Sequence, residues 1–302
     1  METLQLIMRY EVTDGGFSIS IKGEVGDKSQ AGLAIAQLLD PDPAHPAFLV
    51  SLQLPLVERG FCCPATISSI AEPMDESCPE ANLTPKFSFV DLHTDYGADG
   101  VTTLIDDCRK IWFLYPPTSS NLAALASVNG QRRKLLHILH KLEAGIIVET
   151  SSSEALWIPA GCIHATFTIE GGFLVGSAFT TSQSITAIST LIASGLEKSE
   201  DAREECFNWF KKSLDAALLH RKFSDVLNAW IQAEAFFRDW AAQTKDWAKD
   251  TKEIWSKNQD DLNTAGFACP CGFHDDSTEL FTHLSATHLS FLVNSRKRRR
   301  SD

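Results

Sequence analysis

The sequence predicts an α+β protein, in which an antiparallel β-rich part precedes a helical part. Between residues 87 and 179, short apolar runs of strand length are separated by Gly, Asp and Pro residues that favour turns. Between residues 184 and 262, the apolar residues recur with the period of a helix. The chain has 302 residues, of which 44% are hydrophobic and 22% charged, and this suffices for packed cores in one or two domains.

The segment before the β-rich part is predicted to contain strands, one helix and a loop. The patterns favour strands at Leu4–Val12, Phe17–Ile21 and Phe48–Leu56, and a helix at Lys28–Leu39 that the following prolines end. Gly60–Pro85 is rich in Pro, Ser and Glu and is predicted to be a loop. This loop is either a surface connection, which the composition favours, or a segment that shapes access to a site.

His93 and Asp95 stand two residues apart in an apolar run. Because successive strand residues point to opposite faces, this spacing projects an imidazole and a carboxylate from the same face. His164 offers a third ligand, delivered from a separate hairpin by the turn at Ile158–Gly161. Two His and one carboxylate with open metal positions are typical of non-haem Fe(II) oxygenases. A packed, metal-free histidine is the alternative for any one of these positions.

Lys110 precedes the apolar run Ile111–Tyr115, which Pro116 and Pro117 end. An ammonium buried in a barrel needs an anionic partner, because an unpaired buried charge is costly. A dicarboxylate co-substrate would supply that partner.

Three segments together resemble the JmjC family of 2-oxoglutarate- and Fe(II)-dependent oxygenases, especially its fungal members. They are HTD at 93–95, KIWFLYPP at 110–117 and LWIPAGCIH at 156–164. The resemblance spans roughly residues 87–181 and implies a double-stranded β-helix, the jelly-roll fold of the cupins.

The resemblance also implies roles for single residues. His93, Asp95 and His164 would bind Fe(II), and Lys110 would hold the distal carboxylate of 2-oxoglutarate. Thr103 and Ser177 are further candidates for the co-substrate cavity.

The family often adds an aromatic or hydroxyl residue to this cavity from a strand before H-x-D. Phe87, Phe89 and the segment around Tyr10 are the alternatives here.

The family resemblance implies an enzyme that hydroxylates a C–H bond while 2-oxoglutarate is converted to succinate. Hydroxylation of an N-methyl group releases formaldehyde, which amounts to demethylation, whereas hydroxylation of a side-chain carbon gives a stable product. A histone or another chromatin protein is the implied substrate. The alternative function is a catalytically silent JmjC-like binding or regulatory module in the nucleus.

Thr118–Leu142 has helical spacing and is predicted to be an insertion between the two halves of the barrel. His137 and His140 lie on this segment, three residues apart, and are interpreted as surface or packing residues rather than as metal ligands. The closing strands are predicted at Ile146–Glu149, Leu156–Ile158, His164–Ile169 and Phe173–Phe179.

Helices are predicted at Ile185–Leu196, Ala202–Leu219 and Phe223–Trp255, with recurrent Trp and Phe. A Trp-rich stripe is typical of a helical core or of an oligomer interface. Because several JmjC enzymes dimerise through helices after the barrel, a homodimer through these helices is a further expectation.

The spacing of Cys269, Cys271, His283 and His288 resembles a C2H2 zinc finger, with His283 on a short helix. Four such ligands would bind Zn(II) and stabilise a unit too small to fold alone. The C-x-C spacing is shorter than that of ordinary fingers, so zinc binding and a metal-free element remain alternatives. A single finger does not favour sequence-specific DNA reading.

The last residues, SRKRRRSD at Ser295–Asp302, are typical of a nuclear import signal or of a phosphate-contacting tail. Together with the finger-like element, they favour the nucleus over the cytoplasm. The formal net charge of -12 and the pI of about 5.2 argue against a general nucleic-acid-binding surface.

The eight scattered cysteines favour a reducing compartment over a disulfide scaffold. The first residues do not predict a secretory signal, and no apolar run reaches the length of a membrane span. The expected division has four parts: a barrel with flanking elements at 1–183, a helical region at 184–262, a finger-like element at 263–290 and a basic tail at 291–302.

Overall fold

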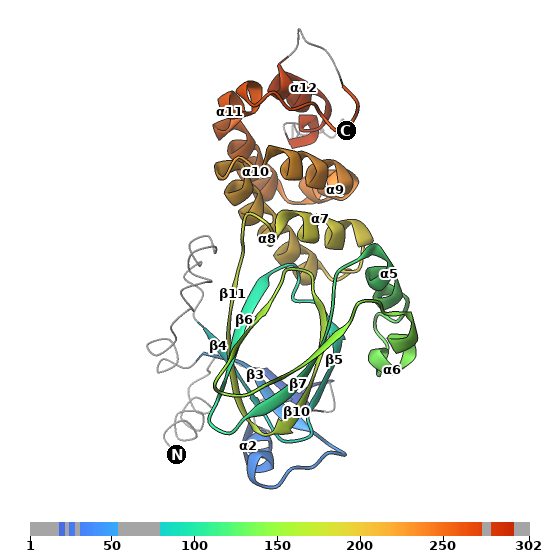
Figure 1. Cartoon of the computed structure of the whole chain (residues 1–302), viewed down its shortest axis with the longest axis vertical. Helices are drawn as coiled ribbons and strands as arrows, with labels where there is room; N and C mark the ends of the chain where they lie inside the picture. Colours follow the sequence, from blue (N-terminus) through green and yellow to red (C-terminus); the bar gives the residue numbers. More distant parts are fainter. Residues whose placement is uncertain (1–17, 22–23, 28–30, 54–78, 274–278, 293–302) are drawn as a thin grey trace, which may run out of the picture. The chain divides into compact units, whose positions relative to one another are not determined.

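The computed structural model describes residues 18–21, 24–27, 31–53, 79–273 and 279–292, which divide into two compact units (Figure 1). The first unit contains the strands and ends at Phe179; the second contains residues 96–98 and the chain from Thr180 onward.

The predicted α+β class is confirmed. The predicted strand Leu4–Val12 and the basic tail lie outside the described residues, and the four-part division stays a prediction.

Two antiparallel sheets form the first unit, with strand orders β2-β1-β3-β4-β11-β6-β9 and β5-β10-β7-β8. The larger sheet consists of β1 (Ser18–Ile21), β2 (Glu24–Val25), β3 (Ala47–Gln53), β4 (Glu80–Thr84), β6 (Asp99–Ile105), β9 (Ala155–Ile158) and β11 (Gly172–Phe179). The smaller sheet consists of β5 (Phe89–His93), β7 (Arg109–Tyr115), β8 (Ile146–Thr150) and β10 (Ile163–Glu170).

The last eight strands pair in a nested order. β4 pairs with β11, β5 with β10, β6 with β9, and β7 with β8. One long hairpin is thus wrapped into two facing sheets, which is the arrangement of a jelly roll. The cupin-like jelly-roll class is therefore observed directly in the strand pairing, and strands β1 to β3 extend its larger sheet (Figure 1).

The larger sheet has an apolar outer face and a mixed inner face. Its outer face packs against α2 (Ala31–Leu39) through fully buried residues such as Leu49, Leu83 and Val175. Because side chains alternate along a strand, their neighbours in sequence point the other way, toward the smaller sheet. That inward side holds the cavity described below.

The predicted loop at Gly60–Pro85 is wrong for residues 80–84, which form strand β4. Its outward residues Ala81 and Leu83 are buried, but its inward residues Asn82 and Thr84 are polar because they line a cavity. Because these inward residues are polar, the segment lacks the apolar pattern from which a strand is normally predicted. Residues 54–78 of that prediction lie outside the described part.

The predicted helical insertion is two helices, α5 (Ser119–Ser127) and α6 (Lys134–Ile138), followed by the short 3-10 helix η2 (Leu139–Lys141). Gly130 and Arg133 separate α5 from α6 with φ angles of 79° and 60°. A right-handed helix cannot pass through this left-handed region, so the insertion breaks there.

The second unit is helical and has an aromatic core. Within it, Trp230 and Trp255 are fully buried, and their rings meet edge to face at 5.3 Å. Of the two interpretations of the Trp-rich stripe, the structure favours a core within one chain. The helices are α7 (Ile185–Ser194), α8 (Glu200–Leu219), α9 (Phe223–Gln243), α10 (Lys245–Lys257), α11 (Gln259–Thr264), α12 (Leu280–Thr287) and the 3-10 helix η3 (Ser290–Leu292).

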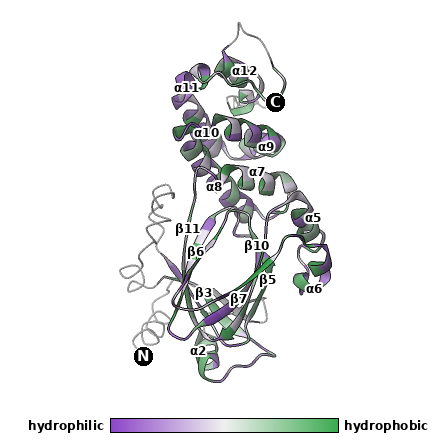
Figure 2. Ribbon diagram, viewed as in Figure 1, coloured by the Kyte–Doolittle hydropathy of each residue, from purple (hydrophilic) through white to green (hydrophobic). Residues whose placement is uncertain are grey.

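Hydrophobic and hydrophilic residues are mixed along the longer helices, as Figure 2 shows, which fits helices with one buried side. Among the described residues, no helix combines the length and the apolar character that crossing a bilayer requires.

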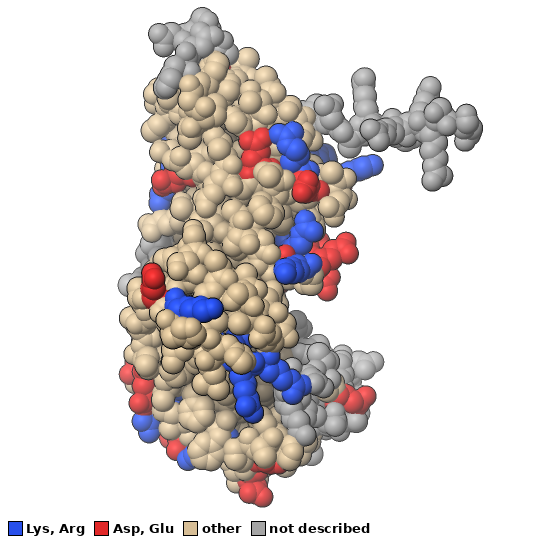
Figure 3. Space-filling view, turned by 90° about the vertical axis from the view of Figure 1, so that its right-hand side faces the viewer, with Lys and Arg blue, Asp and Glu red and all other residues tan. Residues whose placement is uncertain are grey.

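Charged side chains on the described surface are mixed in sign. On the face drawn in Figure 3, small groups of Lys and Arg lie near Asp and Glu side chains. Ion pairs such as Lys86–Glu170 and Lys211–Asp250 occur within the two units.

Candidate functional site

His93, Asp95 and His164 converge at one end of the inner surface of the first unit. His93 ends β5, and His164 lies opposite it on the paired strand β10. Asp95 Oδ1 lies 3.6 Å from His93 Nε2, and Asp95 Oδ2 lies 3.7 Å from His164 Nε2. One donor atom from each residue lies within 4.8 Å of the others. The three predicted ligands therefore surround a space of the size of one metal ion.

Backbone carbonyls orient both imidazoles. His93 Nδ1 donates to the Asp91 carbonyl at 2.8 Å, and His164 Nδ1 donates to the Cys162 carbonyl at 3.1 Å. A carbonyl only accepts, so each Nδ1 carries a proton and each Nε2 keeps its lone pair. Desolvation, with added repulsion from His164, lowers the pKa of His93 to about 4. His93 Nε2 therefore carries no proton near neutral pH, and the Nε2 atoms of His93 and His164 both lie within 3.7 Å of an Asp95 carboxylate oxygen.

A β-bulge in β5 aims His93 into the cavity. Val90 and His93 face Thr166 and His164, which are only two residues apart on β10, so β5 carries one extra residue. Such bulges change the direction of side chains and are frequent beside functional sites. Val90 and His93 consequently both line the cavity, whereas Asp91 turns toward α6.

Asp91 ties the end of β5 to the start of α6. Its carboxylate accepts from the backbone N–H groups of Lys134 at 2.6 Å and Leu135 at 3.0 Å. Lys134 Nζ in turn donates to the Leu92 carbonyl at 2.7 Å. The carboxylate caps the N-terminus of α6 from a distant strand, which fixes the backbone beside His93.

The turn before His164 is held by Asp99. Its Oδ1 accepts from Trp157 Nε1 at 3.0 Å and from the Ala160 N–H at 3.2 Å. Gly161 has a φ of 70°, which favours glycine. These contacts fix the turn that sends β10, and with it His164, across the smaller sheet.

A cavity of about 160 Å³ extends from the three ligands between the two sheets. This volume suits a small organic acid better than a larger organic ligand. Its walls combine the three predicted ligands with apolar and hydroxyl side chains. They are Phe48, Val50, Asn82, Thr84, Val90, His93, Asp95, Thr102, Lys110, Trp112, Ile158, His164, Thr166 and Leu174.

Lys110 lies in this cavity and is 2% exposed. Its ammonium donates to Thr84 Oγ1 and Thr168 Oγ1, each at 2.8 Å. Among the described residues, no carboxylate forms an ion pair with it. Burial lowers the pKa of Lys110 to about 8. The cavity thus holds a cation whose surroundings favour the arrival of an anion.

The predictions of Thr103 and Ser177 as cavity residues are wrong. Thr103 pairs with Val175 on the outer face, and its hydroxyl donates to the Glu154 carbonyl at 3.3 Å. Ser177 lies two residues beyond Val175 and shares that face. Neither residue lines the cavity, whereas the adjacent Thr102 does. A position one residue away in a strand points to the opposite face.

Thr84, which the sequence did not single out, lines the cavity and accepts from Lys110. It comes from β4, a strand before H-x-D whose segment was predicted to be a loop. Phe87 and Phe89 are 43% and 39% exposed and do not line the cavity. Tyr10 lies outside the described residues.

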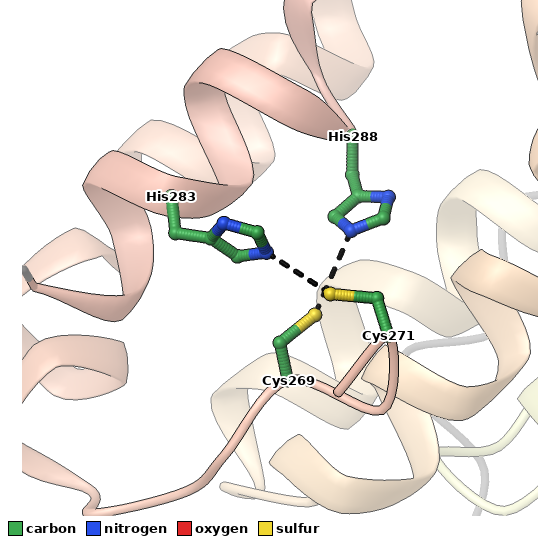
Figure 4. A group of neighbouring side chains, drawn as sticks. All are labelled: Cys269, Cys271, His283 and His288. Atoms are coloured by element: carbon green, nitrogen blue, oxygen red, sulfur yellow. Dashed lines mark hydrogen bonds between the residues drawn. The ribbon is translucent and has the colours of Figure 1, made fainter. Parts of the chain in front are cut away.

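A second group of ligand-type residues lies in the second unit. Cys269, Cys271, His283 and His288 each place one donor atom within 4.8 Å of the others. Figure 4 shows both imidazoles directed at the two sulfur atoms. By contrast, His137 and His140 are exposed on the insertion and belong to neither group.

No protein-family model matches the chain. It is similar, however, to three curated fungal proteins, each named JmjC domain-containing histone demethylation protein 1. The protein of Kluyveromyces lactis is 32% identical over 100 residues, that of Candida glabrata 27% over 104, and that of Saccharomyces cerevisiae 27% over 117. Part of this chain is therefore similar to JmjC domain-containing proteins.

The similarity is confined to part of each protein. The alignments cover 33% to 36% of this chain and 21% to 26% of the relatives' lengths. The chain thus spans about a quarter of the length of these relatives, and their names bear only on the matched third of this chain.

Proposed function

We propose that the JmjC-type domain is a 2-oxoglutarate-dependent Fe(II) dioxygenase that hydroxylates or demethylates a protein, with methylated histone lysine as the substrate class. One observation carries the proposal. A single cavity holds two imidazoles and a carboxylate at one end and a buried ammonium with hydroxyl partners at the other. A metal and a dicarboxylate fit these two ends.

The donor set fits iron better than a structural zinc ion. Two His and one carboxylate leave coordination positions open, whereas structural zinc sites are closed by four protein ligands. His93 and His164 would each present Nε2, and Asp95 one carboxylate oxygen. Bound Fe(II) would supply a Lewis-acidic redox centre where O2 and the co-substrate meet.

The other residues of the cavity would bind and orient the co-substrate. The Lys110 ammonium would pair with its distal carboxylate, and the hydroxyls of Thr84 and Thr168 would hold that ammonium in place. Apolar walls such as Trp112 and Ile158 would exclude water from the reacting end.

The names of the three relatives support histone as the substrate. A chromatin substrate in turn supports a nuclear location, for which the basic tail is a second argument from sequence. A homodimer through the helices of the second unit stays a prediction.

The test is turnover by the purified full chain with Fe(II), 2-oxoglutarate, O2 and histone peptides carrying mono-, di- or trimethyl-lysine. We expect succinate together with formaldehyde, or succinate with a peptide that gains one oxygen atom. His93→Ala removes one ligand and should abolish both products. His137→Ala, which changes an exposed histidine of the same unit, is the matched control and should keep them.

Other outcomes would contradict the proposal. If His93→Ala and the unchanged chain formed succinate equally, turnover would not depend on the site that contains His93. Binding of Fe(II) and 2-oxoglutarate without turnover on any peptide would favour the silent binding module instead.

A further inference from the structure

We propose that Cys269, Cys271, His283 and His288 bind a structural Zn(II) ion, and that Glu234 of α9 couples this ion to the helical core of the second unit. The proposal concerns a site apart from the JmjC-type cavity and is independent of the function proposed for that cavity.

The donor atoms have the spacing of a tetrahedral zinc site. With bonds of about 2.3 Å to sulfur and 2.0–2.1 Å to nitrogen, a tetrahedron places N and S ligands about 3.6 Å apart. Cys271 Sγ lies 3.2 Å from His283 Nε2, and Cys269 Sγ lies 3.6 Å from His288 Nε2. All four donor atoms lie within 4.8 Å of one another (Figure 4). The C-x-C spacing is therefore compatible with one ion.

The turn between the cysteines explains why the short spacing suffices. The Gly272 N–H donates to the Cys269 carbonyl at 3.1 Å, and Gly272 has a φ of 85°. This tight turn curls the backbone so that the two thiols point to the same side (Figure 4).

Glu234 supplies an independent observation. Its Oε2 lies 2.6 Å from His288 Nδ1, and the His288 side chain is 8% exposed. A histidine that binds a metal through one nitrogen commonly donates its other N–H to a carboxylate, which fixes its tautomer and raises its basicity. Glu234 thus directs His288 Nε2, with its lone pair, toward the two thiols.

The ligands are attached to the helical core rather than to a free-standing finger. Trp230 Nε1 of α9 donates to the His288 carbonyl at 3.2 Å, and the Trp230 ring stacks on Phe291. Leu284 and Leu289, from the same part of the chain as His288, are also buried. Because α9 holds His288 by both its side chain and its backbone, the ion would fasten residues 267–273 and 279–292 to the core.

The ligand chemistry separates this site from the first one. Two thiolates and two imidazoles in a closed set select zinc, whereas the open set of His93, Asp95 and His164 lacks sulfur. A thiolate-to-metal charge-transfer band would therefore come from the second site alone.

The experiment uses the full chain with His93→Ala, so that the first site does not contribute to the metal count. Co(II) titration of the metal-free protein should give visible bands of tetrahedral cobalt with thiolate-to-cobalt charge transfer, and one equivalent of Zn(II) should remove them. Cys271→Ser should lose the charge-transfer intensity and the bound zinc. Cys271 is exposed, so this change costs little packing.

Glu234→Gln tests the coupling without removing a ligand. It should keep the tetrahedral spectrum but weaken Zn(II) binding by about 10- to 100-fold in competition with a chelating dye. Glu253→Gln, which changes an exposed glutamate of α10, is the control and should bind zinc as the unchanged chain does. Zinc should also raise the unfolding temperature of the His93→Ala chain but not that of the same chain with Cys271→Ser added.

The absence of a thiolate-to-cobalt band in the unchanged chain, or full zinc binding by Cys271→Ser, would overturn the site. Equal affinity of Glu234→Gln and Glu253→Gln for zinc would overturn the coupling through α9.

Discussion

The ammonium of Lys110 donates to the hydroxyl of Thr84 at 2.8 Å, a contact that joins β7 of the smaller sheet to β4 of the larger sheet inside the cavity. Thr168 accepts a second hydrogen bond from the same ammonium. Hydroxyl groups satisfy the donors of a lysine but do not balance its charge. A bound dicarboxylate would therefore relieve the electrostatic cost of burying this charge.

Lys110→Met should stabilise the protein while removing co-substrate binding. The substitution keeps the length of the side chain and removes a buried charge, so the free energy of unfolding should rise by about 1–3 kcal/mol. Binding of 2-oxoglutarate, measured calorimetrically with Mn(II) in place of iron, should become undetectable. Lys141→Met, at an exposed lysine, should change neither quantity. A destabilised Lys110→Met variant would mean that the ammonium already has adequate compensation.

The pH dependence of stability should report the same lysine. Its pKa falls from 10.5 in the unfolded chain to about 8 in the folded protein, with burial as the main cause. Between these values, the unfolded chain holds a proton that the folded protein has released, so the free energy of unfolding rises with pH. The full difference is about 3 kcal/mol. The stability advantage of Lys110→Met should therefore be largest below pH 8 and shrink as the pH rises toward 10.5.

Co-substrate binding should show the opposite trend with pH. The dicarboxylate pairs with the charged form of Lys110, so its affinity should be insensitive to this group below pH 8. Above pH 8, its affinity should fall by up to about tenfold per pH unit, because the ammonium must first regain its proton. Calorimetric titration across pH 6.5–9.5 measures this, and a flat affinity across that range would exclude Lys110 as the anion partner.

Thr84→Val and Thr103→Val form a matched pair that tests which face of the larger sheet binds the co-substrate. Valine keeps the shape of threonine but removes the hydroxyl. Thr84→Val should raise the dissociation constant of 2-oxoglutarate about 5- to 10-fold, because Lys110 loses one of its two hydroxyl partners. Thr103→Val should leave it unchanged, since that hydroxyl bonds to the Glu154 carbonyl on the outer face. Equal effects of the two substitutions would contradict this assignment.

The sequence predicted that His93, Asp95 and His164 come together, because both their residue types and their local spacing can be read from it. A period of two places His93 and Asp95 on one face, and the apolar run that ends in a turn delivers His164. The sequence did not show to which face of the sheet the Thr103 side chain points. Thr102 and Thr103 are both hydroxyl residues, and a shift by one position exchanges the inner face for the outer one.

Contacts between residues far apart in the chain were not predicted from the sequence, for a different reason. Glu234 and His288 are 54 positions apart, and a glutamate in an amphipathic helix resembles any solvated surface residue. Strand β4 was missed because Asn82 and Thr84, which line the cavity, replace the apolar residues that normally mark a strand. For β4, the polar residues that line the cavity are therefore the reason why the strand was missed.

Asp91 should act as a positioning residue for the metal site. Its carboxylate accepts from the N–H groups of Lys134 and Leu135 at the start of α6, while its carbonyl orients His93. Asp91→Ala leaves those donors without their acceptor, so the free energy of unfolding should fall by about 1–3 kcal/mol. Because the backbone beside His93 loses its anchor, Fe(II) affinity should also fall, by about 10-fold, as expected for loss of a supporting contact.

Asp106→Ala, in the exposed turn between β6 and β7, is the control and should retain the affinity. Chelator competition measures the affinity and denaturant titration the stability. A loss of stability without any loss of affinity would limit Asp91 to capping α6.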